Sequence, residues 1–416
     1  MESLANKPLW TKDFTIITLG TVVSMLGNAV AGFAIGLLVL DYTSSVFLYA
    51  LFMVCYSLPR IVMPLLAGPV LDRFSRRRAI YSLDFLSSAV YLGVFFLLRR
   101  NWFNYPVFIC VAMLVGSIDS VYAVAYNSFF PTLISPGDGN FTRAYSISSL
   151  IYPLAQTIMV PIAGICYKSV GLAPLFLFNT FTFLIAAIME TRITAAEEHS
   201  AAREGETFGV RRFLGDFREG LAYLKKEQGL AAITNYFLIS TLTYAVVSTL
   251  TLPYFKSHPV YSVTTYTLLM AVTTLGRLFG GAFHYRYRFP AAKKFAISVG
   301  VYITLCVMEG TYLFLPLLLM FVFQFIEGAL GVTSYNIRLS GTQSHVEEAM
   351  RGRFNGIFEM YNILGAIMGQ LIAGALGDLL PIRLVIVGAM LVNILGVLTV
   401  LLPRRQAAKE IYNVNV

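Results

Sequence analysis

Long, continuous runs of apolar residues dominate the chain, and short polar segments separate them. Each run has about 20 residues or more, enough for a helix to cross a hydrocarbon core about 30 Å thick. Membrane-spanning strands would instead alternate apolar and polar positions over about ten residues. The pattern therefore predicts helices, which satisfy their own backbone hydrogen bonds in lipid. We expect twelve spans, at residues 14–40, 45–70, 79–98, 103–128, 143–167, 171–190, 229–255, 261–285, 294–313, 315–338, 353–377 and 382–402.

The longest polar segment, residues 191–228, lies between the sixth and seventh spans. It predicts an N-terminal six-helix bundle at 1–190, a cytosolic linker, and a C-terminal six-helix bundle with a short cytosolic tail at 229–416. The linker contains an amphipathic pattern beside Arg and Lys, which is typical of a helix lying on the inner leaflet of the membrane or of a plain cytosolic linker helix. Its apolar positions at helical spacing are Phe213, Phe217, Leu221 and Leu224.

Composition agrees with a membrane protein. Of the 416 residues, 57% are hydrophobic and 13% are charged, whereas soluble domains are usually under half apolar and about a quarter charged. The first apolar run is too long for a signal-peptide core, so we expect it to be retained as the first helix. Four cysteines stand singly in separate apolar runs and predict neither a disulfide framework nor a metal site: Cys55, Cys110, Cys166 and Cys306.

The basic residues predict the orientation of the chain. With the N-terminus in the cytosol, the cytosolic segments hold 24 of the 31 Lys and Arg residues. This asymmetry follows the positive-inside rule and predicts that both termini lie in the cytosol. We expect the protein in the plasma membrane. The net charge of +9 is mostly this bias. We expect no nucleic-acid partner, because the chain lacks an aromatic-interleaved basic surface outside the membrane.

Four charges lie near the middle of predicted spans, where charges are costly and often functional. Arg60 and Arg277 stand at like depth in the second and eighth spans, and Asp119 and Glu327 in the fourth and tenth. Both pairs are offset by a little over two hundred residues, close to the offset between the two halves. This indicates a duplicated six-helix unit, and such repeats are typical of secondary transporters.

We expect Arg60 to pair with Asp119 and Arg277 with Glu327, because a lone buried charge is expensive. These pairs are either static ion pairs or sites at which a carboxylate takes up a proton during transport, with the Arg as its modulator. Polar side chains at helical spacing on neighbouring spans either line a substrate cavity or join helices. The cavity candidates are Asn28, Tyr122, Tyr126, Tyr236, Ser240, Tyr244 and Ser248.

A charged knot, GPVLDRFSRRRAI at 68–80, forms the short cytosolic turn between the second and third spans. The positive-inside rule accounts for its arginines but not for Asp72. A carboxylate there can meet the positive end of a helix, or an arginine, on the other half. Such a contact would exist only while the cytosolic side is closed. We therefore predict that Gly68, Asp72, Arg73, Arg76 and Arg77 form a cytosolic latch.

The pattern from Gly68 to Arg78 resembles the loop signature of the major facilitator superfamily, G-x-x-x-D-R-x-G-R-R/K, with Ser75 in place of the usual glycine. Other stretches are similar to the branch of macrolide-efflux and enterobactin-exporter proteins: FFPTLISPGDGNFTRAYSI, GDFREGLAYLKKEQGL and MRGRFNGIFEMYNILGAIMGQLIAGALGD. The resemblance implies an all-α protein of twelve helices in two pseudo-symmetric bundles. It also implies that Asp72 engages the start of the eleventh span, near Arg351 and Arg353.

The motifs of other classes of protein are absent. No Gly-Lys dipeptide occurs, which excludes a Walker A loop. The four histidines show no metal-ligand spacing, so we expect no metal, no cofactor and no enzymatic activity. We predict a monomeric secondary transporter that works by alternating access and exports an amphipathic, drug- or siderophore-like small molecule in exchange for protons. The alternatives are an importer or uniporter of a small metabolite, and a membrane sensor or scaffold without transport.

Overall fold

The computed structural model describes residues 8–63, 75–137, 140–195 and 210–414. Within these residues, all regular secondary structure is helical, as predicted. The α-helices are α1 (Lys12–Thr43), α2 (Val46–Ser57), α4 (Arg76–Arg99), α5 (Tyr105–Phe129), α6 (Asn140–Val170), α7 (Ala173–Glu190), α8 (Val210–Lys226), α9 (Gln228–Ser257), α10 (Val263–Arg286), α11 (Lys294–Thr311), α12 (Leu317–His345), α13 (Glu348–Gly377), α14 (Ile382–Gly396) and α15 (Arg405–Tyr412). Short 3₁₀ turns are η1 (Phe130–Leu133), η2 (Ala291–Lys293) and η3 (Tyr312–Phe314), and a π-helical turn, η4 (Val397–Leu401), follows α14.

Each of the twelve predicted spans corresponds to one helix, with ends that differ by a few residues. The second span is helical over Val46–Met63, and its predicted end at residue 70 lies outside the described residues. Among the described residues, eleven helices are long and apolar enough to cross a membrane. The twelfth, α10, has 24 residues, but its many threonines lower its mean hydropathy.

Helix starts follow from the local sequence. Thr11, Ser75 and Asn104 stand just before α1, α4 and α5, and each side chain accepts a hydrogen bond from a backbone N–H of the first turn at 3.2 Å. Small polar side chains are favoured there because the first N–H groups of a helix have no partner within it. Local capping therefore sets where these spans begin.

The chain forms two compact units. Unit 1 contains residues Met1–Ser44 and Phe52–Thr207, and unit 2 contains Ser45–Leu51 and Phe208–Val416. The first turns of α2 thus belong to unit 2, and the rest of that helix belongs to unit 1.

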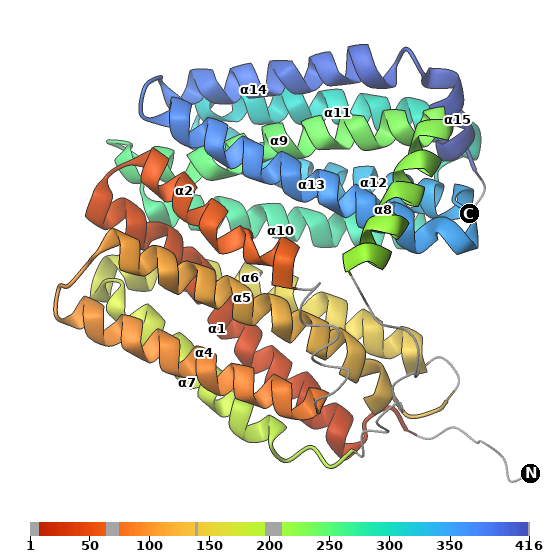
Figure 1. Ribbon diagram of the computed structural model, residues 1–416. Coiled ribbons are helices and arrows are strands. Elements are labelled where there is room, and N and C mark those ends of the chain that lie inside the picture. Colours follow the sequence, from red (N-terminus) through yellow and green to blue (C-terminus); the bar gives the residue numbers. More distant parts are fainter. Residues whose placement is uncertain (1–7, 64–74, 138–139, 196–209, 415–416) are drawn as a thin grey trace, which may run out of the picture. The chain divides into compact units, whose positions relative to one another are not determined.

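In unit 1, α1 packs against α6 and α7, and α4 packs against α5 and α7 (Figure 1). The ring of Tyr91 on α4 stacks on Phe183 and Phe176 of α7, with centroids 5.8 and 6.2 Å apart. A second cluster near the start of α1 buries Phe14 and Ile17 completely. These contacts hold the charged side chains of α4, α5 and α7 at fixed positions.

In unit 2, α9 packs against α13 and α14, α10 against α12, and α11 against α14 (Figure 1). The C-terminal segment is more ordered than the plain tail that the sequence predicts. Its helix α15 buries Ile411 and Tyr412, and the Tyr412 hydroxyl lies 3.0 Å from the hydroxyl of Tyr302 on α11. The tail therefore belongs to the core of unit 2.

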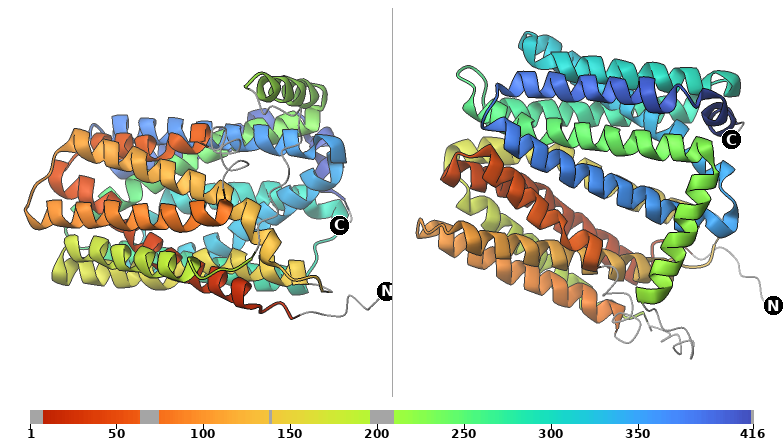
Figure 2. Two further views of the ribbon diagram at one scale, coloured as in Figure 1. Left: turned by 60° about the horizontal axis from the view of Figure 1, so that its bottom comes forward. Right: turned by 45° about the horizontal axis from the view of Figure 1, so that its top comes forward.

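The predicted amphipathic helix is α8, which lies across the ends of α9 and α13 (Figure 2). Its Leu224 is buried in one cluster with Ile357 and Phe358 of α13, and Phe217 and Leu221 pack against that cluster. The sequence favoured an apolar face resting on the inner leaflet. In the structure Phe217, Leu221 and Leu224 of this face pack against protein. The side chain of Phe213 lies outside the described residues, and the position of the helix on the leaflet stays a prediction.

Candidate functional site

Asp119, in the middle of α5, is held by a tyrosine. The Tyr56 hydroxyl on α2 donates a hydrogen bond to Asp119, with 2.6 Å between Oη and Oδ2. Arg60, one turn further along, lies over the ring of Tyr56 with Cζ 5.2 Å from the centroid, and its Nη2 is 3.4 Å from the tyrosine oxygen. The structure therefore links Arg60 to Asp119 through Tyr56, whereas the sequence predicted a direct pair.

Glu327 of α12 forms a second carboxyl site, in unit 2. Its side chain is 6% exposed, and the Tyr244 hydroxyl on α9 donates a hydrogen bond to its Oε1 at 3.3 Å. Glu309 of α11, 5% exposed, lies within hydrogen-bond reach of Glu327. Arg277 of α10 lies near enough for its charge to act on both carboxyl groups. The sequence predicted Arg277 as the partner of Glu327 and missed Glu309 and the hydrogen bond from Tyr244.

Glycines at helix crossings bring these groups together. Gly116 stands three residues before Asp119 on α5. A Cβ on Gly116 would overlap the backbone carbonyl oxygen of Tyr56. A Cβ on Gly328 of α12, next to Glu327, would overlap the carbonyl oxygen of Thr273 on α10. Small residues let two helix backbones approach closely in this way. The close crossings set the distance between each carboxyl group and its neighbouring helix.

A third carboxyl site was not predicted. Asp84 of α4 and Glu190 of α7 are 1% and 0% exposed, and their carboxyl groups lie within hydrogen-bond reach of each other. Tyr122 of α5 donates to Glu190 Oε1 at 3.5 Å. Among the described residues, no side chain or backbone group donates to Asp84 Oδ2 or Glu190 Oε2. Two carboxyl groups in this arrangement can share one proton.

A signal for these missed residues was present in the sequence. Asp84 and Glu309 stand inside predicted spans, and Glu190 is the last residue of one. The comparison of the two halves selected only charges with a counterpart at equal depth. None of these three residues has an acidic counterpart at equal depth in the other half, because Asp84 and Glu309 stand at different depths of the third and ninth spans, so the comparison passed over them.

Two predicted cavity residues of unit 1, Tyr122 and Tyr126, lie on one polar stripe of α5. Tyr122 and Tyr126 stack with centroids 6.1 Å apart, and the Tyr126 hydroxyl lies 3.5 Å from Ser148 Oγ on α6. Asn28 on α1 is half-buried. Tyr122 therefore connects the predicted cavity stripe to the buried Asp84–Glu190 pair.

The four residues predicted along α9 separate into different environments. Tyr244 is 44% exposed and Ser248 is exposed, while Ser240 is half-buried. Tyr236 is 1% exposed, and its ring lies 5.0 Å from that of Tyr302 in the core of unit 2. Its spacing matches that of the other three, but packing by α11 makes it a core residue and removes it from the cavity candidates.

For the predicted latch, Gly68, Asp72 and Arg73 lie outside the described residues. Arg76 Nη1 donates to the Ser128 carbonyl at 3.5 Å and Arg77 Nη2 to the Thr191 carbonyl at 2.9 Å, both within unit 1. In unit 2, Arg351 Nε donates to the Val346 carbonyl at 3.2 Å, and Arg353 pairs with Glu219 of α8 at 3.4 Å. These contacts hold helix ends within each unit, and the latch stays a prediction.

Asp378, which follows α13, caps the start of α2. Its carboxylate accepts hydrogen bonds from Ser45 Oγ and from the backbone N–H groups of Val46 and Phe47, at 2.8, 2.8 and 3.1 Å. Partial burial by itself would raise the pKa of Asp378, but these three donors outweigh it, and the pKa lies below its ordinary value. The sequence offered no pairing for Asp378, because its partners are over three hundred residues away.

Comparison with known proteins finds related sequences. A family model described as Major Facilitator Superfamily matches residues 17–337. The uncharacterized MFS-type transporter YkuC of Bacillus subtilis (strain 168) is 25% identical over 232 residues, which is 55% of this chain and 53% of that protein. The multidrug efflux pump Tap of Mycolicibacterium fortuitum is 22% identical over 97% of this chain and 98% of its own length. The chain thus matches about half of one of these relatives and nearly all of the other.

Solved structures of transporters share the fold. The nucleoside transporter NupG has a TM-score of 0.68 at 11% identity, over 92% of this chain and 97% of its own. A bacterial homologue of the iron transporter ferroportin, in an inward-facing state, has a TM-score of 0.65 at 15% identity, over 92% and 97%. The peptide transporter POT has a TM-score of 0.71 at 12% identity, over 98% and 97%. At these identities the likeness concerns the fold alone.

Proposed function

Because the chain belongs to the major facilitator superfamily and is a multi-pass membrane transporter, we propose that it exports an amphipathic small molecule from the cell in exchange for protons. Both termini are cytosolic in this proposal, as the distribution of Lys and Arg predicts. The two six-helix halves rock about a central site, and each opens the substrate path to one side of the membrane at a time.

Support for the outward direction comes from the full-length likeness to a protein named as a multidrug efflux pump. The apolar and aromatic character of the spans suits an amphipathic substrate, because 14% of the chain is Phe, Trp or Tyr. Aromatic side chains supply large apolar contact areas with a polar group at one end.

The observation that carries proton coupling is the carboxyl pair of Glu309 and Glu327 in the middle of unit 2. Two adjacent carboxyl groups in a low-dielectric interior cannot both be ionised without a large cost, so one proton shared between them is favourable. Tyr244 donates to Glu327 and is itself 44% exposed. In the proposal it lies between the shared proton and the substrate path, and its movement opens a route for the proton.

Asp119 is the proposed coupling group of unit 1. The Tyr56 hydroxyl stabilises its ionised form, and Arg60 contributes a positive charge over the ring of Tyr56. If Tyr56 turns away during transport, Asp119 loses a donor in a sparsely hydrated region, which favours proton uptake. Arg60 and Arg277 are proposed as modulators of the two sites, and Asp72 with its neighbouring arginines as the cytosolic latch.

The proposal can be tested in everted membrane vesicles from cells that express the protein. An acidic lumen should drive accumulation of an amphipathic dye, and ethidium is the first probe of a panel of such dyes. Glu327→Gln should abolish the part of the accumulation that depends on the pH gradient. Glu410→Gln makes the same chemical change at an exposed position of α15 and should leave accumulation unchanged.

The remaining outcomes separate the alternatives. Depletion of dye from the lumen would indicate an importer, and accumulation that ignores the pH gradient would indicate a uniporter. Either result would contradict the proposed exchange, as would equal pH-driven accumulation by the wild type and Glu327→Gln.

A further inference from the structure

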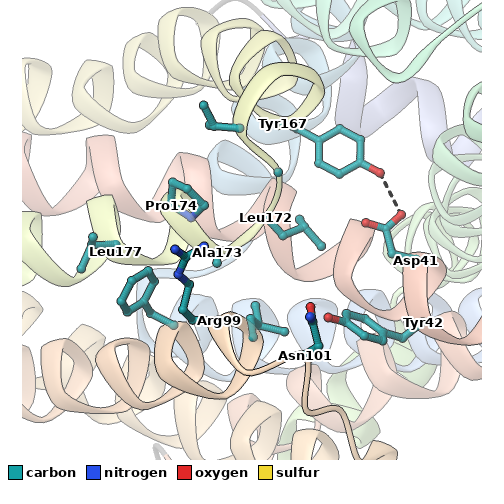
Figure 3. A pocket seen from close by; sticks show the side chains of 13 residues that line it. Asp41, Tyr42, Arg99, Asn101, Tyr167, Leu172, Ala173, Pro174 and Leu177 are labelled. Atoms are coloured by element: carbon teal, nitrogen blue, oxygen red, sulfur yellow. Dashed lines mark hydrogen bonds between the residues drawn. The ribbon is translucent and has the colours of Figure 1, made fainter.

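A cavity of about 680 Å³ lies in unit 1, away from the carboxyl sites, where the ends of four membrane-spanning helices meet (Figure 3). The last turns of α1, α4 and α6 and the first turn of α7 form its walls. Its volume falls in the range of about 300–1,000 Å³ that is usual for small-molecule sites. The lining residues used below are Asp41, Leu98, Arg99, Tyr167, Val170 and Ala173.

One side of the cavity is positively charged. Arg99 lines it with an exposed side chain and makes no hydrogen bond or ion pair with any described residue. Figure 3 shows its guanidinium beside Ala173 and Pro174, the first residues of α7. That helix has no side-chain cap, because Leu172 precedes it. In this first turn Pro174 has no N–H and the Leu175 N–H donates to the Leu172 carbonyl at 3.0 Å, which leaves the Ala173 N–H at the positive helix end. A guanidinium beside that helix end is repelled unless an anion lies between them.

The opposite side supplies acceptors. The Tyr167 hydroxyl donates to Asp41 Oδ1 at 2.8 Å, and both residues face the cavity (Figure 3). Apolar side chains, including Leu98 and Val170, also line the cavity. A ligand that contacts both polar sides therefore carries an anionic group at the end near Arg99 and a cationic hydrogen-bond donor at the end near Asp41 and Tyr167.

The position of the cavity indicates where such a ligand comes from. All four helices that line it are membrane spans that end there, so the cavity lies at the level of the lipid headgroups. Val170 on its rim and nearby Phe96 expose 59% and 56% of their side chains, which gives acyl chains an apolar surface. Trp102, in the turn after α4, is 43% exposed, and Trp is enriched at this depth of the bilayer.

We propose that this cavity binds the headgroup of phosphatidylethanolamine. The phosphate lies between the Arg99 guanidinium and the first turn of α7, where a bidentate charge-assisted contact is available. The primary ammonium faces Asp41 and the oxygen of Tyr167, to which it donates hydrogen bonds. A choline headgroup has the same charges but no N–H donor, so it fits only the phosphate side. The inference does not depend on the direction of transport or on proton coupling.

Arg100 offers a matched control for Arg99, because it is adjacent, has the same charge, is exposed and does not line the cavity. The full-length protein in detergent is mixed with phosphatidylethanolamine, and binding is followed by the shift in melting temperature and by lipid adducts in native mass spectrometry. We expect Arg99→Gln to weaken binding about tenfold, in line with loss of a charge-assisted hydrogen bond. Arg100→Gln should bind as the wild type does, and Arg99→Lys should recover part of the binding.

Further arms distinguish the sources of the ligand. Phosphatidylcholine should bind more weakly than phosphatidylethanolamine, and Asp41→Asn should remove this difference. Equal weakening by Arg99→Gln and Arg100→Gln would overturn the proposal. The proposal would also be overturned if inorganic phosphate or free phosphoethanolamine raised the melting temperature as much as the lipid does. The site would then bind anions from solution. Circular dichroism of each lipid-free variant shows whether it is folded.

Discussion

At the scale of single residues, the carboxyl groups inside the spans are distinguished by their partners. Asp119 and Glu327 each accept a hydrogen bond from a tyrosine of a neighbouring helix, but Glu327 also lies beside the carboxyl group of Glu309. A tyrosine donor stabilises the ionised form, and a second carboxyl group favours a shared proton. Equal charges at equal depth therefore have different chemistry in the two environments.

The hydrogen bond from Tyr56 can be tested by stability. Tyr56→Phe should lower the free energy of unfolding by about 0.5–2 kcal/mol, because it removes a donor to a carboxylate between two spans. Denaturant titration in detergent micelles measures the change. Tyr285→Phe, at a side chain that is 94% exposed, should have no effect. Equal free energies of unfolding for the two variants would mean that the hydrogen bond from Tyr56 to Asp119 adds no net stability, because the hydroxyl finds an equally good partner after unfolding.

At the scale of helices, close backbone contacts determine which side chains meet. Gly116 places α2 directly on α5, and Gly328 places α12 directly on α10. Asp378 connects α13 to the first turn of α2, which belongs to unit 2. A single helix can therefore take its partners from both units.

Substitution of Gly116 should show the cost of this close approach. Gly116→Ala places a methyl group against the Tyr56 carbonyl and should destabilise the protein by about 1–3 kcal/mol, as overpacking usually does. Gly93→Ala is the control, because a Cβ there meets nothing within 4 Å and alanine has the higher helix propensity. Thermal unfolding in detergent compares the two. A neutral Gly116→Ala would show that α2 shifts freely away from α5.

The contact of Asp378 should depend on pH. Asp378→Ala should lower stability by about 1 kcal/mol near pH 7, as loss of a helix cap does. The pKa of Asp378 in the folded protein lies below the unfolded value of about 3.9, so its contribution is fully present above that pH and disappears as the pH falls through the folded pKa. The stability gap between wild type and variant should be constant from about pH 8 to 5 and close below about pH 4. A gap that closes near neutral pH would contradict the lowered pKa.

At the scale of the whole molecule, the transporter fold accounts for the cost of the buried charges. Isolated carboxyl groups in lipid would destabilise a span, but each of these faces other helices of its own unit. In the proposed alternating-access cycle, exchange of substrate requires only that the occupied carrier reorients. Under the proposed proton coupling, net transport also requires that a proton leaves and rebinds in each cycle.

The difference between exchange and net transport predicts how variants of the proposed coupling groups behave. Asp119→Asn and Glu327→Gln should each reduce pH-driven net transport at least tenfold, because the substituted group cannot release a proton. Exchange of labelled for unlabelled substrate across the membrane should survive in both. Preloaded proteoliposomes measure the two rates in the same preparation. Full pH-driven transport in both variants would remove these residues from the coupling role.

Some of the site could be predicted from sequence and some could not. Asp119 and Glu327 stood out because a charge in the middle of an apolar run is conspicuous without any knowledge of neighbours. Tyr56 did not stand out, since tyrosine is ordinary in a span and only the crossing at Gly116 brings it to Asp119. Tyr236 shows the opposite error, because its spacing matched that of Tyr244 while α11 covers it.

By itself, the sequence determined that this protein is a bundle of membrane helices with a break after the sixth span, because hydrophobic length and backbone hydrogen bonding in lipid leave no other solution. The charges at mid-span also followed from local pattern. Only the tertiary structure decided which groups pair, that α8 and α15 pack into unit 2, and that four helix ends enclose a charged cavity. Those outcomes depend on helix rotation and crossing, which a continuously apolar span does not encode in its periodicity.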